Sequence, residues 1–533
     1  MGANARKFYA LSAARRHRIC RPARGGRTAA PQPAATLECE DAFGANIAFF
    51  DKSQLRGATI LTLTGATVLS VLHLVLAVVV TCHILVHKRD PGSAVAWIGI
   101  AWLSPVLGSL LYALLGINRV RRRALTMRAP RAPRAPRAPA PASAVAADNG
   151  GEDYLAPLEY SAQRITGRPA KNGNAILILR NGDEAYPRMI ACIDAAQKSV
   201  ALSSYIFRAD AAGIPFIEAL VRAHRRKIEV RVLIDGVGGG YFWSTTYLKL
   251  RQAGVPVARF LHSPLPWRMP FLNLRSHKKL LGVDGRTAFI GGLNIGAENL
   301  IRTAPTHPVL DTHFSLEGPV VAQIIDTFAD DWFFITGERL AGERWFPAVA
   351  PAGESIARAV TSGPDQDLEK IELMILQAVG AARSSVKVMT PYFLPDDRII
   401  TVLALASMRG VEVDLILPAS SNHPTLDWGA RAHIGPLLAA QCRIWTHAAP
   451  FDHSKLLTVD GKWCLVGSAN WDMRSFRLNF ELNVEIYHAA LVLQLEQFIT
   501  QKQETRLSMD ALERTSLPAS LRNSAARLML PYL

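Results

Sequence analysis

Cysteine is scarce in this chain of 533 residues, and its pattern argues against a metal site. The six cysteines form no C-x-x-C pair, and none lies near a histidine at the spacing of a zinc site. We expect reduced structural thiols of a cytosolic compartment, no metal and no cofactor. The glycine-rich stretch at 235–240 lacks the third glycine of a dinucleotide-binding loop, so a loop at the end of a strand is the better interpretation.

Acidic residues are missing from the N-terminus, where none precedes Glu38. Residues 1–47 are rich in Arg and Ala, which is typical of a transit peptide, of a disordered basic tail or of a misassigned start; we expect a disordered tail over 1–57. The formal net charge of the whole chain is +16. Such a charge favours nucleic acid, an acidic membrane surface or a phosphate substrate, and does not separate the three.

Asp, Glu, Lys and Arg are absent from two long apolar stretches, 58–86 and 93–117. Because about 20 apolar residues cross a bilayer, we expect a transmembrane helical hairpin over 58–118. His73 and His83 lie inside the first stretch and are interpreted as tolerated neutral residues. The alternative is a pair of buried helices in a soluble protein.

An arginine-rich segment follows the second apolar stretch, with eight arginines between Arg119 and Arg137. Positive flanks mark the cytoplasmic side, so both ends of the hairpin and the rest of the chain are expected in the cytoplasm. The repeated "RAP" triplets predict a low-complexity linker over 119–170. These arginines could also bind anionic lipid headgroups.

From about 175, stretches typical of strands and helices alternate, and their order repeats. Val200 corresponds to Val386 and Ile228 to Val411, with an offset that drifts slowly along the chain. This pattern predicts an α/β fold of two duplicated domains, 171–345 and 346–510, with parallel or mixed sheets flanked by helices. A C-terminal tail over 511–533 would follow.

One nonapeptide occurs in both repeats, as "HKKLLGVDG" from His277 and as "HSKLLTVDG" from His453. The Asp-Gly pairs 284–285 and 460–461 predict tight β-hairpins. Strand alternation would place each His on the same face as the Lys two residues later. The returning strands carry small residues and amides. The candidate groups on these hairpins are His277, Lys279, Asn294, His453, Lys455, Ser468 and Asn470.

These side chains suit chemistry on a phosphodiester. Lys and Asn donate hydrogen bonds to anionic oxygens and stabilise charge in the transition state. One neutral His can attack phosphorus while a second, protonated His donates a proton to the leaving alkoxide. The two Lys would replace the charge of a metal ion, so none is required.

The two H-x-K-x-x-x-x-D motifs resemble those of the phospholipase D superfamily over roughly 175–505. "NLRSHKKL", "DTHFSLEGP", "DMRSFRLNFELN" and the apolar N-terminal pair resemble bacterial cardiolipin synthases in particular. The resemblance implies an enzyme of the bacterial inner membrane, with cytoplasmic catalytic domains. It would join two phosphatidylglycerols into cardiolipin and release glycerol. No nucleic acid partner is expected, and the oligomeric state stays open.

The resemblance also implies residue roles. His277 would form a phosphatidyl-histidine, and His453 would act as general acid and base. Asp311 and Glu481 would orient the two imidazoles. Asp284 and Asp460 complete the catalytic motif, although the hairpin interpretation gives them a structural task. The first copy departs from the family by reading "GGLN" where Gly-Ser is expected.

Other functions remain open beside this one. A phospholipase D that uses water has the same chemistry, a phosphodiesterase nuclease would suit the basic charge, and a membrane scaffold could retain the fold without activity.

The stretch 261–276, with Trp267 and Phe271, is interpreted either as an interfacial loop that admits acyl chains or as an internal packing loop.

Overall fold

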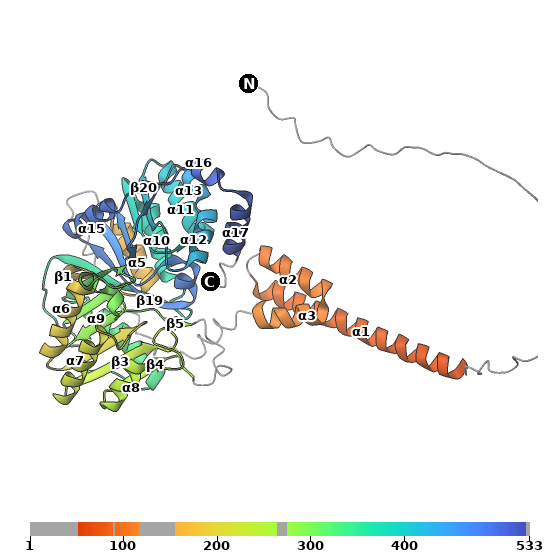
Figure 1. Cartoon of the computed structure of the whole chain (residues 1–533), viewed down its shortest axis with the longest axis horizontal. Helices are drawn as coiled ribbons and strands as arrows, with labels where there is room; N and C mark the ends of the chain where they lie inside the picture. Colours follow the sequence, from red (N-terminus) through yellow and green to blue (C-terminus); the bar gives the residue numbers. More distant parts are fainter. Residues whose placement is uncertain (1–51, 89–90, 117–154, 264–273, 529–533) are drawn as a thin grey trace, which may run out of the picture. The chain divides into compact units, whose positions relative to one another are not determined.

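A computed structural model of the chain describes residues 52–88, 91–116, 155–263 and 274–528 (Figure 1). The chain divides into two compact units, Met1–Gly116 and Ile117–Leu533. The described part of the first unit is helical, and that of the second is α/β.

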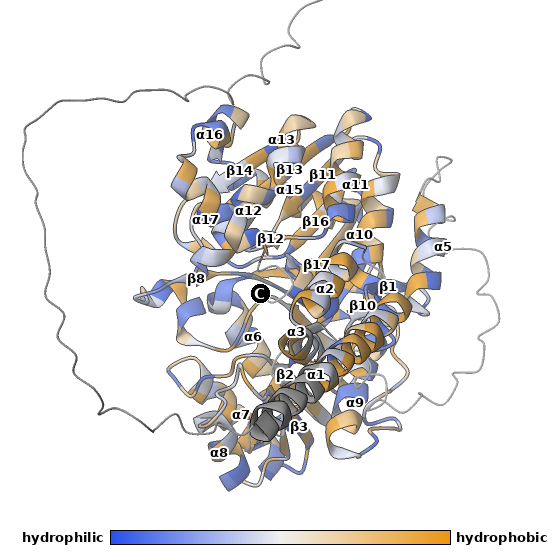
Figure 2. Cartoon of the chain, turned by 90° about the vertical axis from the view of Figure 1, so that its right-hand side faces the viewer, coloured by the Kyte–Doolittle hydropathy of each residue, from blue (hydrophilic) through white to orange (hydrophobic). Residues whose placement is uncertain are grey.

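The first unit holds α1 (Lys52–His87), α2 (Pro91–Leu103), α3 (Pro105–Leu111) and the π-helical turn η1 (Tyr112–Gly116). Within the described residues, one stretch, Thr67–His87 of α1, is long and apolar enough to cross a membrane. The coloured residues of α1 and α2 are mostly hydrophobic (Figure 2).

The second predicted span, 93–117, is not one helix. Ser104 adopts φ −144° and ψ 83°, which separates α2 from α3. Pro105 explains the break, because a proline ring removes a backbone donor and disfavours helical geometry in the residue before it. The apolar stretch 93–117 is thus built from two helices and a π-helical turn, and Thr67–His87 is the one candidate span among the described residues. The transmembrane hairpin over 58–118 stays a prediction.

The broken segment is tied to α1 by polar contacts. His83 Nδ1 lies 2.8 Å from the Tyr112 hydroxyl, and Trp102 Nε1 donates to Thr81 Oγ1 at 3.1 Å. His83 therefore has a partner in η1, beyond the passive role that its sequence context indicated.

The second unit is built on one continuous sheet, in which sixteen strands of the described residues take part. The first repeat contributes β1 (Lys171–Arg180), β2 (Ser199–Ser204), β3 (Glu229–Asp235), β4 (Val257–Phe260), β5 (Arg275–Ser276), β6 (Leu280–Val283), β7 (Thr287–Gly291) and β9 (Thr312–Glu317). The second repeat contributes β10 (Ser355–Ser362), β11 (Ser385–Met389), β13 (Glu412–Pro418), β14 (Arg443–His447), β16 (Leu456–Val459), β17 (Trp463–Gly467), β19 (Asn479–Tyr487) and β20 (Thr505–Arg506).

The strand order shows that the two repeats are arranged alike. From the centre outward the first repeat runs β1-β9-β7-β6-β2-β3-β4, and the second runs β10-β19-β17-β16-β11-β13-β14. The seam between them is the antiparallel pair β1–β10. The outer strands of each repeat are parallel and the inner ones antiparallel, so the sheet is mixed. The predicted duplicated α/β fold is confirmed.

Helices cover both faces of the sheet (Figure 1). One shared core lies under α9 (Val321–Thr336) and α15 (Ala489–Gln501) and draws residues from both repeats. On the other face, one core packs under α6 (Asn181–Ala195), α7 (Gly213–Arg225) and α8 (Thr245–Gln252). The second packs under α5 (Leu155–Thr166), α10 (Lys370–Ala381), α11 (Asp397–Met408) and α13 (Gly435–Ala439).

Helices also occur where a linker and a tail were expected. α5 lies within 119–170, and it buries Leu155 and Leu158 against the core of the second repeat. α16 (Met509–Glu513) and α17 (Leu517–Leu528) follow the second repeat, and α17 packs against α12 (Pro424–His433). Both boundaries were missed because the apolar residues of these short helices are too few to stand out from polar surroundings.

Candidate active site

The two motif histidines lie in breaks between strands rather than within one strand. His277 follows β5, and β6 begins only at Leu280; His453 follows β15 (Phe451–Asp452), and β16 begins at Leu456. The single continuous strand assumed for His277 and Lys279 is therefore not present, although both side chains lie against Tyr205. The hairpins beyond the breaks form as expected, with both turn residues Asp284 and Gly285 at positive φ.

Each break exists because the chain crosses to the other repeat. β5 pairs in parallel with the start of β19, and the His277 backbone amide donates to the Phe480 carbonyl at 2.9 Å. In the same way β15 pairs with β8 (Val309–Leu310), and the His453 amide donates to the Leu310 carbonyl at 2.7 Å. The backbone of each histidine is thus held by the repeat to which it does not belong.

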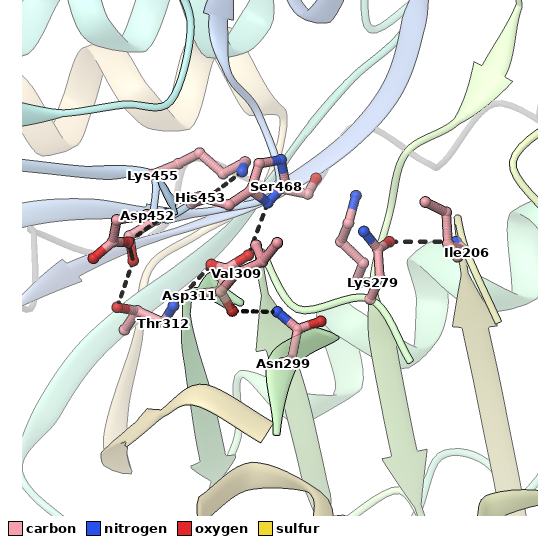
Figure 3. A network of polar contacts seen from close by, with 12 residues as sticks. Ile206, Lys279, Asn299, Val309, Asp311, Thr312, Asp452, His453, Lys455 and Ser468 are labelled. Atoms are coloured by element: carbon pink, nitrogen blue, oxygen red, sulfur yellow. Dashed lines mark hydrogen bonds and ion pairs between the residues drawn. The ribbon is translucent and has the colours of Figure 1, made fainter. Parts of the chain in front are cut away.

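The imidazole ring of each histidine is also held by the opposite repeat. His277 Nδ1 lies 3.0 Å from Glu481 Oε1 and 3.1 Å from the Ser468 carbonyl oxygen. His453 Nδ1 lies 2.8 Å from Asp311 Oδ2 (Figure 3). In both pairs the acid comes from the other repeat. The two ring centroids are 6.5 Å apart, with the planes nearly perpendicular.

These contacts define which ring nitrogen carries the proton. A backbone carbonyl only accepts hydrogen bonds, so the Ser468 carbonyl requires that His277 Nδ1 is protonated. On His453, Nδ1 likewise faces an acceptor, the Asp311 carboxylate. In the neutral state each Nε2 then has a free lone pair, which is the form a nucleophile or a general base requires.

The two motif lysines are buried beside the histidines, 3% exposed in each case. Lys279 Nζ donates to the His277 carbonyl oxygen at 2.7 Å, and Lys455 Nζ donates to the His453 carbonyl oxygen. One ammonium proton is used in each contact, and two remain for other acceptors.

The asparagines face the pocket between the histidines. Asn294 Oδ1 accepts from the Ile206 amide at 3.3 Å, so its NH₂ group is the end left for a ligand. Asn470 is 6% exposed, and its Oδ1 has no partner among the described residues. Ser468 was singled out as a small residue on the returning strand. Its hydroxyl donates to Glu481 Oε2 at 2.5 Å and so supports the acid.

Asp284 and Asp460 point away from the histidines and bind backbone amides. Asp284 accepts from the amides of Gln197, Lys198 and Ser199 at 2.6–2.9 Å. Asp460 accepts from the three equivalent amides before β11, those of residues 383–385. Each carboxylate therefore fastens its hairpin turn to the start of the neighbouring strand.

The glycine pair in "GGLN" has a steric cause. A Cβ on Gly292 would lie 2.1 Å from Asp311 Oδ1, so the acid that faces His453 occupies the space of a side chain. The equivalent position in the second repeat holds Ser468, which hydrogen-bonds to its acid instead. The departure from the family pattern therefore follows from the close approach of Asp311.

Burial dominates the electrostatics of the site. It raises the pKa values of Asp311 and Glu481 to about 7 each, and it lowers those of Lys279 and Lys455 to about 7 and about 8. Burial and the nearby lysine charges lower the pKa values of both histidines well below the usual range. The site therefore has several groups poised to change charge near neutral pH.

A pocket of about 360 Å³ opens over the two histidines. Its wall also contains Tyr205, Tyr392, Asn422 and His423, which the sequence did not single out. It further contains Arg275, Asp472 and Arg474, which lie in the stretches "NLRSHKKL" and "DMRSFRLNFELN" but had been assigned no role. Tyr205 packs edge-on to His277 at 4.9 Å, and Tyr392 packs against His453 at 6.1 Å. Both tyrosines come just after the second strand of a repeat, which is a signal that the internal duplication could have supplied.

The structure also bears on the glycine-rich stretch, the proposed interfacial loop and the question of a metal site. Asp235, in the glycine-rich stretch, is buried and accepts from the Ser276 amide at 2.8 Å, directly before His277. Trp267 and Phe271, from the proposed interfacial loop, lie outside the described residues. In the part of the chain that the structure describes, no group of three or more His, Cys, Asp or Glu is placed to hold a metal ion.

Comparison with known proteins gives consistent matches. Residues 189–332 and 375–502 match the family described as "Cardiolipin synthase, PLD-like domain", and 75–116 match the phospholipase D-nuclease N-terminal family. A cardiolipin synthase of Geobacillus kaustophilus is 30% identical over 84% of this chain and 91% of its own length. The major cardiolipin synthase of Bacillus subtilis is 30% identical over 87% and 98%.

Among solved structures, phosphatidylserine synthase of Haemophilus influenzae has a similar fold. Its TM-score is 0.55 at 15% sequence identity, and the match covers 71% of this chain and all of that one. At this identity the likeness concerns the fold alone.

Proposed function

Since this chain belongs to the cardiolipin synthase family of phospholipase D-like phosphatidyltransferases, we propose that it transfers the phosphatidyl group of one phosphatidylglycerol to a hydroxyl of another. The products are cardiolipin and glycerol. The observation that carries the proposal is the histidine pair in one pocket, 6.5 Å apart, with each ring held by an acid of the opposite repeat.

In the first step, the neutral Nε2 of His277 attacks the phosphorus of the donor lipid. The nitrogen–phosphorus bond forms as the bond to the glycerol oxygen breaks, and His453 gives its proton to that oxygen. His453 is neutral at rest because of its burial; the negative charge of the arriving phosphodiester favours its protonation. Glu481 stabilises the positive charge that develops on His277.

In the second step, the free hydroxyl of the acceptor lipid enters where glycerol left. His453 now takes the hydroxyl proton, the new oxygen–phosphorus bond forms, and the bond to His277 breaks. Asp311 holds the resulting imidazolium. The enzyme returns to its starting protonation state, so no external base is consumed.

Four side chains bind the reacting phosphate in this proposal, namely Lys279, Lys455, Asn294 and Asn470. Each lysine keeps two donor protons beyond the one that its own backbone uses, and the asparagines supply amide donors from both repeats. An anion between the lysines also restores their full positive charge, because it compensates the cost of burial. Charge in the transition state is then balanced without a metal ion.

The substrate and the N-terminal helix suggest the location. We assign the enzyme to the bacterial inner membrane, with Thr67–His87 of α1 as a span. The eight arginines between Arg119 and Arg137 support a cytoplasmic position for the catalytic unit.

The test is the product formed by the purified full-length protein in phosphatidylglycerol vesicles. Mass spectrometry should detect cardiolipin and free glycerol in equal amounts, and the H277A/H453A double variant should form neither. Phosphatidic acid in place of cardiolipin would overturn the transferase proposal and identify a water-using phospholipase D. EDTA should leave the rate unchanged.

A further inference from the structure

The pocket over the histidines has two different sides. Arg275 and Arg474 line it near His277: Arg275 Nη1 donates to the Tyr205 hydroxyl at 2.7 Å, and Tyr205 packs on the His277 ring. The positive charge of Arg474 is close enough to lower the pKa of His277. Around His453 the neighbours are instead the aromatic rings of Tyr392 and Phe451.

The internal duplication shows that the fold does not require these arginines. Arg275 stands two residues before His277, and the same place before His453 is Phe451. Arg474 stands four residues after Asn470, whereas Glu298 stands four residues after Asn294 and pairs with the exposed Arg208 at 3.2 Å. Both cations are therefore additions on one side of a site whose histidines, lysines and acids are otherwise matched.

The two acids near the arginines use their hydrogen bonds on backbone amides, and their charges also act on Arg275 and Arg474. Asp472 lines the pocket, but its Oδ1 caps α14 (Met473–Arg477) by accepting from the Ser475 amide at 2.7 Å. Asp235 accepts from three backbone amides, those of Val237, Gly238 and Ser276. The two guanidinium groups line the same pocket, where their planar sets of donors can still reach an anion.

The proposed reaction, on which this inference rests, brings two phosphates together. The donor phosphate sits between the histidines and uses the lysines and asparagines. The acceptor lipid carries a phosphodiester of its own, only a glycerol unit away, and this charge repels the first. We propose that Arg275 and Arg474 form a second phosphate site, which holds the non-reacting phosphate of the second phospholipid beside the reacting one.

This site would decide what the phosphatidyl group is transferred to. Water and simple alcohols have no phosphate, so they gain nothing from the arginines. A second phospholipid gains charge-assisted hydrogen bonds from guanidinium groups, which can bind two phosphate oxygens at once. The arginines would therefore raise the share of transfer to lipid over transfer to water or to a neutral alcohol.

The experiment is a competition between acceptors. Full-length wild type and the R275Q/R474Q variant are incubated in phosphatidylglycerol vesicles with a fixed amount of 1-propanol, and cardiolipin, phosphatidylpropanol and phosphatidic acid are quantified. The ratio of cardiolipin to phosphatidylpropanol should fall about tenfold or more, as expected for the loss of one or two charge-assisted hydrogen bonds.

Matched variants separate this effect from folding. R477Q removes an arginine from the same helix, α14, whose side chain instead pairs with Asp396 at 3.0 Å, and it should keep the wild-type ratio. R275K and R474K retain the charge without the planar fork and should give intermediate ratios. If the double variant does not fold, the two lysine variants carry the test.

The outcomes are distinct. An unchanged ratio in R275Q/R474Q, or wild-type ratios in both lysine variants when the double variant is inactive, overturns the second phosphate site. A wild type that forms phosphatidylpropanol and phosphatidic acid but no cardiolipin overturns the proposed function itself. A ratio that falls in the glutamine variant while R477Q matches the wild type supports both.

Discussion

The two repeats of the catalytic unit agree in the groups placed for chemistry and differ in what surrounds them. Both have a histidine in a strand break, a lysine bound to the histidine carbonyl and an acid that crosses to the opposite histidine. The residues that follow the two histidines make different contacts. Lys278 makes a buried ion pair with Asp331 at 2.6 Å, whereas the equivalent Ser454 hydrogen-bonds to Thr312 and Asp452. Shared groups therefore indicate shared chemistry, and divergent ones indicate separate tasks.

Removing one histidine at a time tests most directly whether the two repeats have different catalytic roles. H277A and H453A should each lower kcat/KM by about 10⁴-fold or more, since the two act as a unit. They should differ with a donor whose leaving group is p-nitrophenol, which departs without a proton. H453A should then release one equivalent in a burst and accumulate a lipid adduct on His277, seen by intact-protein mass spectrometry at neutral pH. An adduct in H277A would reverse the proposed roles.

Substitutions of Asp311 and Glu481, the acids that contact the histidine of the opposite repeat, should give the second-largest loss of activity. E481Q and D311N should each reduce kcat/KM by about 10²-fold, because neither amide stabilises an imidazolium. In the wild type, kcat/KM should fall as the pH drops below about 7, where Asp311 and Glu481 gain protons. It should also fall as the pH rises, first above about 7, where Lys279 loses its proton, and further above about 8, where Lys455 loses its own.

The pH profile also tests this assignment. E481Q should weaken the acid limb, because one of the two titrating carboxylates is gone, while the alkaline limb persists. An acid limb unchanged in both E481Q and D311N would mean that other groups set it.

The smallest effect on activity should come from the motif aspartates. D284A and D460A each remove hydrogen bonds to three backbone amides, so the free energy of unfolding should fall by about 2–3 kcal/mol in urea denaturation. Under conditions where the variants stay folded, kcat should change less than about fivefold. D284N, which tolerates the positive φ, is the control for the turn itself. A large loss of kcat at unchanged stability would restore a catalytic role.

Much of this arrangement follows from local sequence. The Asp-Gly turns, the alternation of strands and helices and the recurrence of His-x-Lys predict the hairpins and the duplication. What local patterns do not contain is the pairing of distant strands. The β1–β10 seam, the strand breaks before Lys279 and Lys455 and the crossing of Asp311 and Glu481 all depend on contacts between repeats.

Pocket residues outside the motifs escaped prediction for a related reason. Arg275, Arg474 and Tyr205 come from three separate segments. Arg275 and Arg474 lie in stretches that carry the family resemblance, but nothing local shows that their side chains meet in one pocket. In the second apolar stretch, composition alone did not indicate the helix break that Pro105 introduces.

The antiparallel β1–β10 seam also bears on how such a site could arise. A single-copy ancestor could complete it only as a homodimer, because each histidine takes its acid from the other copy. In a homodimer every substitution appears twice, so an arginine at position 275 would also replace Phe451. Gene fusion removes that constraint. In one polypeptide each copy can change alone, so the two ends of the pocket are free to differ, as Arg275 and Phe451 do.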